Sequence, residues 1–176
     1  VRFAAQLDFQ IEPATFAALQ ANAPKIVAIS AERIREELIK IFHPPFGVPP
    51  SGGSGDYYGH PPKGGTANGR RAARGLDLLR DSRLLEHILP EVAAASACEQ
   101  SPDYHPEGSL YNHLRLMLSQ MRAGADTSLP WAVLLHDIAK PVTASRDPTT
   151  GSIHFYEHEK IGATMAGQIL ERLRFP

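Results

Sequence analysis

The residues of this sequence that could do chemistry are histidines and an aspartate placed within apolar helical patterns. His136 and Asp137 are neighbours inside the nearly continuous apolar stretch 131–140. Burying an ionised carboxylate costs free energy unless it is paired or bound to a metal. Asp137 could therefore be a metal ligand, or it could cap a turn or pair with Lys140 or Arg115, and the spacing leaves both interpretations open.

Two further histidines lie on apolar helical faces. His113 follows Leu110 by three residues, which places it on the buried side of a helix predicted over 110–122. His158 precedes Ile161 by three residues in a helix predicted over about 157–173. Imidazole nitrogens combined with a carboxylate oxygen suit a divalent ion such as Mn, Fe, Ni, Zn or Mg, whereas a single core histidine would serve packing alone.

The elements that would position these side chains are helices, and the sequence predicts an all-α fold. Pro130 and Pro141 bound the helix that carries His136 and Asp137. The only hint of a strand is the segment 152–156. From apolar spacing we expect helices over 13–20, 30–42, 72–89 (divided near 81–82), 92–98, 110–122, 131–140 and about 157–173.

The helical pattern is broken by a Pro/Gly-rich segment that we assign to residues 44–70. Of the 26 residues from 44 to 69, 6 are proline and 8 are glycine. Such a composition cannot bury enough apolar surface to offset its ordering entropy, so we predict a flexible, disordered insertion.

Composition narrows the classes of protein that this chain could belong to. The 176 residues carry a net charge of −1, which gives no bulk attraction to nucleic acid, so any RNA contact must come from a local patch. The single cysteine, Cys98, excludes a disulfide framework and a cysteine-based zinc site. The longest apolar run, 131–135, is far below the roughly 20 residues that span a bilayer, and no signal peptide is visible. We therefore expect a cytoplasmic protein without a membrane partner.

Two blocks of sequence resemble one known family. His113 and the run His136-Asp137-Ile138-Ala139-Lys140-Pro141 resemble the signature of HD-superfamily phosphohydrolases. The segments 105–109, 134–137, 158–163 and 170–174 resemble, more specifically, the HD domain of bacterial CCA-adding tRNA nucleotidyltransferases. The segments 1–13 and 29–38 resemble the neck of those enzymes and of the related bacterial poly(A) polymerases.

The resemblance implies a domain plan and a set of roles. It places neck and RNA-binding helices in 1–43, body helices in 71–102 and an HD domain in 103–176. His113, His136 and Asp137 would hold a divalent ion (Mg, Mn or Ni). Asp137 would also orient a water, Lys140 would meet a phosphate oxygen, and His158 would be an outer ligand or general acid. The implied substrates are 2′,3′-cyclic phosphates, 2′-nucleotides and simple monoesters.

A tRNA or an RNA 3′ end is the second implied partner. Arg2, Arg33 and Arg35 would bind the phosphate backbone of the RNA. Further basic residues that could contribute to this binding are Lys40, Arg70, Arg71 and Arg74. Taken singly, each of these side chains is better explained as ordinary solvated helix surface. A non-catalytic, tRNA-binding scaffold with a vestigial HD domain is accordingly the alternative function, whereas a free-standing HD nucleotidase would leave the neck-like block unexplained.

The sequence also departs from the family pattern. The nucleotide-adding head domain would precede residue 1, so this chain alone should not add nucleotides, and a CCA-adding parent cannot be separated from a poly(A) polymerase parent. The HD signature ends with a further aspartate that has no counterpart before Pro176, so His158 or His154 would have to replace it and the HD domain is expected to be truncated. Ala139 replaces a glycine of most relatives, a change we expect to be tolerated. The oligomeric state is left open.

Overall fold

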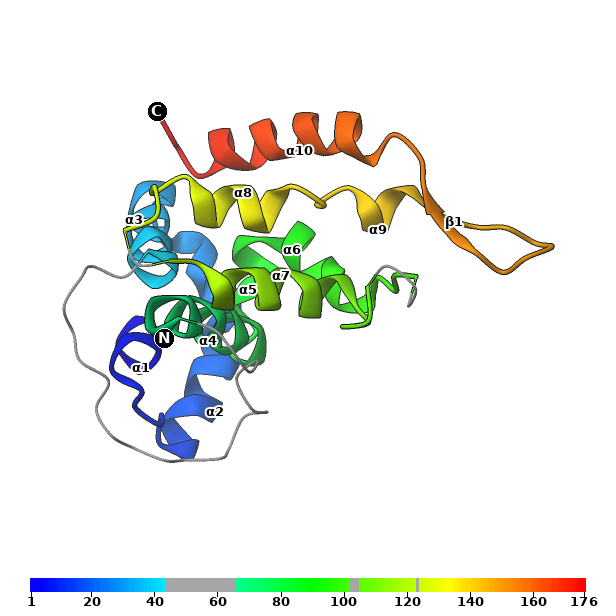
Figure 1. Ribbon diagram of the computed structural model, residues 1–176. Coiled ribbons are helices and arrows are strands. Elements are labelled where there is room, and N and C mark those ends of the chain that lie inside the picture. Colours follow the sequence, from blue (N-terminus) through cyan, green and yellow to red (C-terminus); the bar gives the residue numbers. More distant parts are fainter. Residues whose placement is uncertain (44–65, 102–104, 123) are drawn as a thin grey trace.

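The computed structural model describes residues 1–43, 66–101, 105–122 and 124–176 (Figure 1). These residues are mostly helical, which confirms the predicted all-α class. A small antiparallel hairpin of β1 (Ala144–Arg146) and β2 (Ile153–Phe155) is the exception, and β2 falls on the predicted strand. No helix in the described ranges is long and apolar enough to cross a membrane. Residues 44–65 of the predicted insertion lie outside the described residues.

The N-terminal part is built from α1 (Arg2–Leu7), α2 (Pro13–Asn22), the 3-10 helix η1 (Ala23–Ala28) and α3 (Ala31–Phe42). Helix α2 begins at the predicted proline, and the Glu12 side chain caps it by accepting from the Thr15 amide at 2.7 Å. The apolar stripe of α3 is buried as expected. Helix α1 was not predicted, because six residues are too few for helical spacing to be recognised.

The middle part comprises α4 (Ala67–Asp81), α5 (Leu84–Ile88), α6 (Pro90–Ala94) and the 3-10 helix η2 (Ala95–Ala97). The predicted break near residues 81–82 is confirmed. The predicted helix start at residue 72 is wrong, because α4 starts at Ala67, capped by Thr66, whose amide donates to the Ser119 carbonyl at 3.0 Å. Gly69 lies within this helix, at a position where a Cβ would collide with the Ser119 carbonyl, so the close approach of α4 to α7 requires glycine there.

The last part contains α7 (Leu110–Gln120), α8 (Leu129–Leu135), α9 (Lys140–Thr143) and α10 (His158–Arg172), with α10 running back along α8 and α9 (Figure 1). The continuous helix predicted over 131–140 is wrong: α8 ends at Leu135, and residues 136–139 form turns. Pro141 does not stop a helix but sits in the first turn of α9, where a missing N–H costs little.

One apolar core joins the N-terminal helices to the helices that carry the histidines. At its end, Trp131 of α8 lies edge-on to Phe42 of α3, with ring centroids 6.2 Å apart, and to Phe175, at 4.7 Å. The guanidinium of Arg35 lies over the Phe175 ring at 5.7 Å. The helices of residues 1–43 are therefore packed against α8 and Phe175 through aromatic contacts rather than joined to them only by the chain.

Candidate metal centre

His136 and Asp137 occupy the turn that follows α8. The Nδ1–H of His136 donates to the Val133 carbonyl at 2.9 Å, which leaves Nε2 facing the Oδ2 atom of Asp137 at 3.1 Å. Two acceptor atoms at this distance need a proton or a cation between them. Neighbouring ligands of an ion bound at about 2.1 Å would be about 3 Å apart at a right angle, so the separation fits a shared ion. In the metal-free protein the hydrogen bond to Asp137 raises the pKa of His136.

Asp137 is the buried centre of the cluster, with 6% of its surface exposed. Its Oδ2 atom lies 2.6 Å from the Nζ of Lys140, and its Oδ1 atom lies 3.5 Å from the Nε2 of His158. Burial opposes ionisation, but the hydrogen bonds from His136 and Lys140 hold the pKa of Asp137 well below its ordinary value. Asp137 is therefore an ionised carboxylate at neutral pH, as a metal ligand must be.

His113 brings the third donor from α7. Its ring centroid is 5.5 Å from that of His136, and one ligand atom from each of His113, His136 and Asp137 lies within 4.8 Å of the others. The Nδ1 atom of His113 contacts the Oε1 atom of Glu107 at 2.5 Å. The structure thus brings together the three residues predicted as metal ligands, and the donor set of two imidazoles and one carboxylate fits a divalent transition ion.

Lys140 lies at the cluster but not as the sequence suggested. The shared helical face with His136 does not exist, because turns separate α8 from α9. The Lys140 side chain is buried and donates to Asp137 and, at 2.8 Å, to the Oε1 atom of Gln100. Its ammonium group is thus an internal counter-ion of Asp137 in this structure.

His158 is the first residue of α10, and its ring faces the cluster. Its Nδ1–H donates to the Phe155 carbonyl at 2.7 Å, which turns Nε2 toward Asp137. His154 instead stacks on Tyr156 in the hairpin, with ring centroids 5.4 Å apart. The side chain of His136 is 36% exposed, so the cluster is open to solvent on that side.

Two residues that contact the site, Glu107 and Gln100, were not predicted from the sequence. Glu107 contacts His113, and its Oε1 atom also lies 3.2 Å from the Nδ1 of His105. Gln100 binds Lys140. Glu107 lies in the segment 105–109, which resembles the HD domain of the family, but its spacing to His113 does not match a helical period. The spacing of Gln100 to other residues gives no indication of its role.

The arginines predicted to bind RNA differ in their surroundings. Arg2 pairs with Glu37 at 2.6 Å and lies over the Phe3 ring at 4.1 Å. Arg35 lies over Phe175. Arg33 is exposed on α3. Of the three, Arg33 is therefore the side chain most accessible to a partner, whereas Arg2 and Arg35 also support packing.

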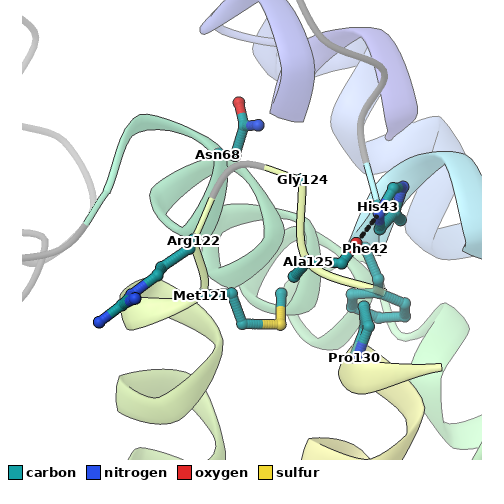
Figure 2. A pocket seen from close by; sticks show the side chains of 8 residues that line it. All are labelled: Phe42, His43, Asn68, Met121, Arg122, Gly124, Ala125 and Pro130. Atoms are coloured by element: carbon teal, nitrogen blue, oxygen red, sulfur yellow. Dashed lines mark hydrogen bonds between the residues drawn. The ribbon is translucent and has the colours of Figure 1, made fainter. Parts of the chain in front are cut away.

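A separate pocket lies where the end of α3 meets the start of α4 and the α7–α8 connection (Figure 2). His43 closes one side of it by donating from Nε2 to the Ala125 carbonyl at 2.8 Å. None of the metal-centre residues lines it. The described lining residues are Phe42, His43, Asn68, Met121, Arg122, Gly124, Ala125 and Pro130.

Two segments of the chain match models of known protein families. Residues 110–175 match the model of the HD domain, and residues 8–49 match the model described as a probable RNA and SrmB-binding site of polymerase A. The A-adding tRNA nucleotidyltransferase of Deinococcus radiodurans is 32% identical over 183 residues, covering 99% of this chain and 36% of the relative. The chain belongs to the CCA-adding tRNA nucleotidyltransferase family.

Other relatives in this family are multifunctional CCA proteins. That of Azoarcus sp. is 32% identical over 180 residues, covering 99% of this chain and 36% of the relative. That of Halorhodospira halophila is 38% identical over 105 residues, covering 58% of this chain and 24% of the relative. The chain thus spans about a third of the length of the two relatives that it matches throughout, and it corresponds to the RNA-binding and HD region of the CCA-adding family.

The matched ranges contain most of the residues predicted for the two sites. The HD match contains His113, His136, Asp137, Lys140 and His158. The RNA-binding match contains Arg33 and Arg35 but begins after Arg2. Glu107 lies before the HD match, although it touches one of the residues inside it.

Proposed function

We propose that the HD half is a divalent-metal-dependent phosphohydrolase centre for 2′,3′-cyclic or 2′-phosphoesters, and that the neck binds tRNA or another RNA 3′ end. The observation that carries the first part is the convergence of His113, His136 and Asp137, whose ligand atoms lie within 4.8 Å of one another. The match of residues 8–49 to an RNA-binding model supports the second part. Such an RNA-processing role would place the protein in the cytoplasm.

A bound ion would lower the pKa of a water and so supply hydroxide near neutral pH. Asp137 would orient that water through the carboxylate oxygen that faces His158. His158, with Nδ1–H anchored on Phe155, presents Nε2 beside Asp137; as the imidazolium, protonated on both nitrogens, it would donate the Nε2 proton that a leaving alkoxide takes up and return to the neutral Nδ1–H form. Lys140 would hold Asp137 ionised and fixed in orientation.

One observation favours the alternative function, a tRNA-binding scaffold with a vestigial HD domain. The Asp137 carboxylate already has a buried cationic partner, because Lys140 lies 2.6 Å from its Oδ2 atom. An aspartate whose charge is balanced internally can be retained for structure alone. In this case the RNA-binding part of the proposal would stand without the hydrolytic part.

Calorimetric titration with Mn²⁺ and Ni²⁺ separates the two functions. The phosphohydrolase proposal predicts one site per chain, lost in Asp137→Ala and kept in Asp147→Ala. Asp147 is a matched control because its carboxylate accepts from the Thr149 and Thr150 amides in the hairpin turn. Hydrolysis of a 2′,3′-cyclic nucleotide should follow the same pattern. Absence of metal binding in the unaltered chain would refute the hydrolytic part and leave the scaffold.

A further inference from the structure

The loop before α7 holds Glu107 in a defined position. The Gly108 amide donates to the His105 carbonyl at 3.0 Å, closing a turn, and Gly108 has a φ of 89°, which glycine adopts without steric cost. The Nδ2 of Asn112 donates to the Glu107 carbonyl at 3.0 Å. The hydroxyl of Ser109 caps α7 by accepting from the Asn112 amide at 3.3 Å. The loop and the first turn of α7 therefore form one unit.

Two histidines converge on the carboxylate of Glu107. Its Oε1 atom lies 2.5 Å from the Nδ1 of His113 and 3.2 Å from the Nδ1 of His105, and the two rings meet edge-on with centroids 4.9 Å apart. An ionised carboxylate only accepts hydrogen bonds, so each of these Nδ1 atoms must carry the proton. The Nε2 of a neutral His113 is then unprotonated, with its lone pair free for a ligand contact.

We propose that Glu107 is a positioning residue of the metal centre. It accepts the Nδ1–H of His113, fixes the tautomer of the ring and so presents Nε2 for the cluster with His136 and Asp137. A carboxylate behind a ligating histidine fixes the orientation of the ring and raises its basicity. The donation from His105 holds the carboxylate in place. This inference rests on the proposed function in taking a divalent ion as the partner of Nε2.

The same three side chains suggest a competing role, a second metal site of His105, Glu107 and His113. His113 would then have to offer both ring nitrogens, one to each centre. A neutral imidazole keeps a proton on one nitrogen and therefore cannot do so. The close approach of Nδ1 to Oε1 also favours a hydrogen bond, because two ligands of one ion stand farther apart than these atoms do.

The first test is the tautomer of His113 in the metal-free, full chain. Long-range ¹H–¹⁵N spectra at a pH well above the ordinary histidine pKa of about 6.5 separate protonated from unprotonated ring nitrogens. A His113→Gln copy assigns the signals. The unaltered chain should show the Nδ1–H form, Glu107→Ala should gain the Nε2–H form, and Glu107→Gln, which keeps an acceptor oxygen, should fall between them. Glu171→Gln, on the exposed side of α10, is the matched control and should change nothing.

The second test is Mn²⁺ affinity by calorimetry, expected to fall about 10–100-fold in Glu107→Ala and less in Glu107→Gln. A His113 tautomer that is unchanged by either substitution, an Nε2–H form in the unaltered chain, or two ions per chain would overturn the role given to Glu107. If the tautomer shifts as expected while the unaltered chain binds no Mn²⁺, the control of His113 by Glu107 stands and the phosphohydrolase proposal fails. Circular dichroism confirms that each variant is folded.

Discussion

Replacing Lys140 with methionine should strongly destabilise the metal-free protein. Lys140 is 7% exposed, and its Nζ lies 2.6 Å from Asp137 and 2.8 Å from Gln100. Methionine keeps much of the side-chain length but removes the charge and with it the contact of Nζ with the Phe155 ring, whose centroid lies 5.4 Å away. Asp137 would remain buried without its nearest cation, and Gln100, whose Nε2 already lacks a hydrogen-bond partner among the described residues, would lose the partner of its Oε1.

The size of the effect follows from the burial of the pair. Breaking a buried ion pair by removing one partner costs about 3–5 kcal/mol. For a chain of this length each kcal/mol lowers the midpoint of thermal unfolding by about 2–4 °C, so a fall of about 6–20 °C is expected. Lys160→Met is the matched control, because Lys160 pairs with Glu157 at 2.9 Å on an exposed face of α10. Its loss should cost less than about 1 kcal/mol.

Thermal unfolding, followed by circular dichroism, should be measured first with a chelator and then with Mn²⁺. The chelator series gives the cost of each substitution in the absence of metal, and the Mn²⁺ series gives the stabilisation by the ion. An ion that binds only the folded state adds about 2.7 kcal/mol at a hundred times its dissociation constant. In Lys140→Met the ion would also supply the positive charge that Asp137 has lost, so Mn²⁺ should raise the midpoint more than in the unaltered chain. A Lys140→Met midpoint equal to that of Lys160→Met in chelator would refute the assignment of Lys140 as counter-ion.

Four other outcomes are expected. Asp77→Asn should lower the free energy of unfolding by about 2–3 kcal/mol in urea titrations, because buried Asp77 accepts from Tyr111 at 2.9 Å and pairs with Arg115 at 2.7 Å. Gly69→Ala should cost about 1–3 kcal/mol and also weaken Mn²⁺ binding, because the added Cβ collides with the backbone of α7, which carries His113. Burial opposes ionisation of Glu91, but the hydrogen bond from Arg172 lowers the pKa of Glu91. The contribution of Glu91 to stability is therefore present above the ordinary glutamate pKa and is lost as the pH falls through the folded-state pKa. Glu91→Gln should flatten the acid side of the profile of stability against pH. Arg33→Ala should reduce the salt dependence of tRNA affinity by about one unit of slope in anisotropy titrations, whereas Arg35→Ala should chiefly lower thermal stability.

The helices were predictable where an apolar stripe runs over several turns. Helix α7 starts at the predicted Leu110, and α3 ends at the predicted Phe42. The prediction of one helix over 131–140 was wrong because an apolar run indicates burial but does not show whether the backbone stays helical. Residues 136–139 form turns in which His136 is exposed and Asp137 is buried, and the apolar run does not indicate where the helix ends.

The parts of the site that could not be predicted depend on contacts that form only when the loops have folded. Gln100 is 40 residues from Lys140 in sequence, and only the packed fold brings them together. Glu107 is six residues from His113, and its approach depends on the turn that Gly108 closes. The sequence identified ligand types on buried faces, whereas the residues that orient those ligands became visible only with the loops in place.

The aromatic junction decides how the RNA-binding and HD roles can be separated experimentally. Phe42 is 1% exposed and Trp131 6% exposed, and the two rings meet between the neck helix and the helix that leads to His136. Removing residues 1–43 would open this apolar surface to water and destabilise α8, whose end positions His136 and Asp137 of the candidate metal centre. A loss of hydrolysis in such a truncated chain would therefore say nothing about RNA. Point substitutions at Arg33 and Asp137 in the full chain leave the junction intact, so they are the changes that distinguish an RNA-binding defect from a metal-centre defect.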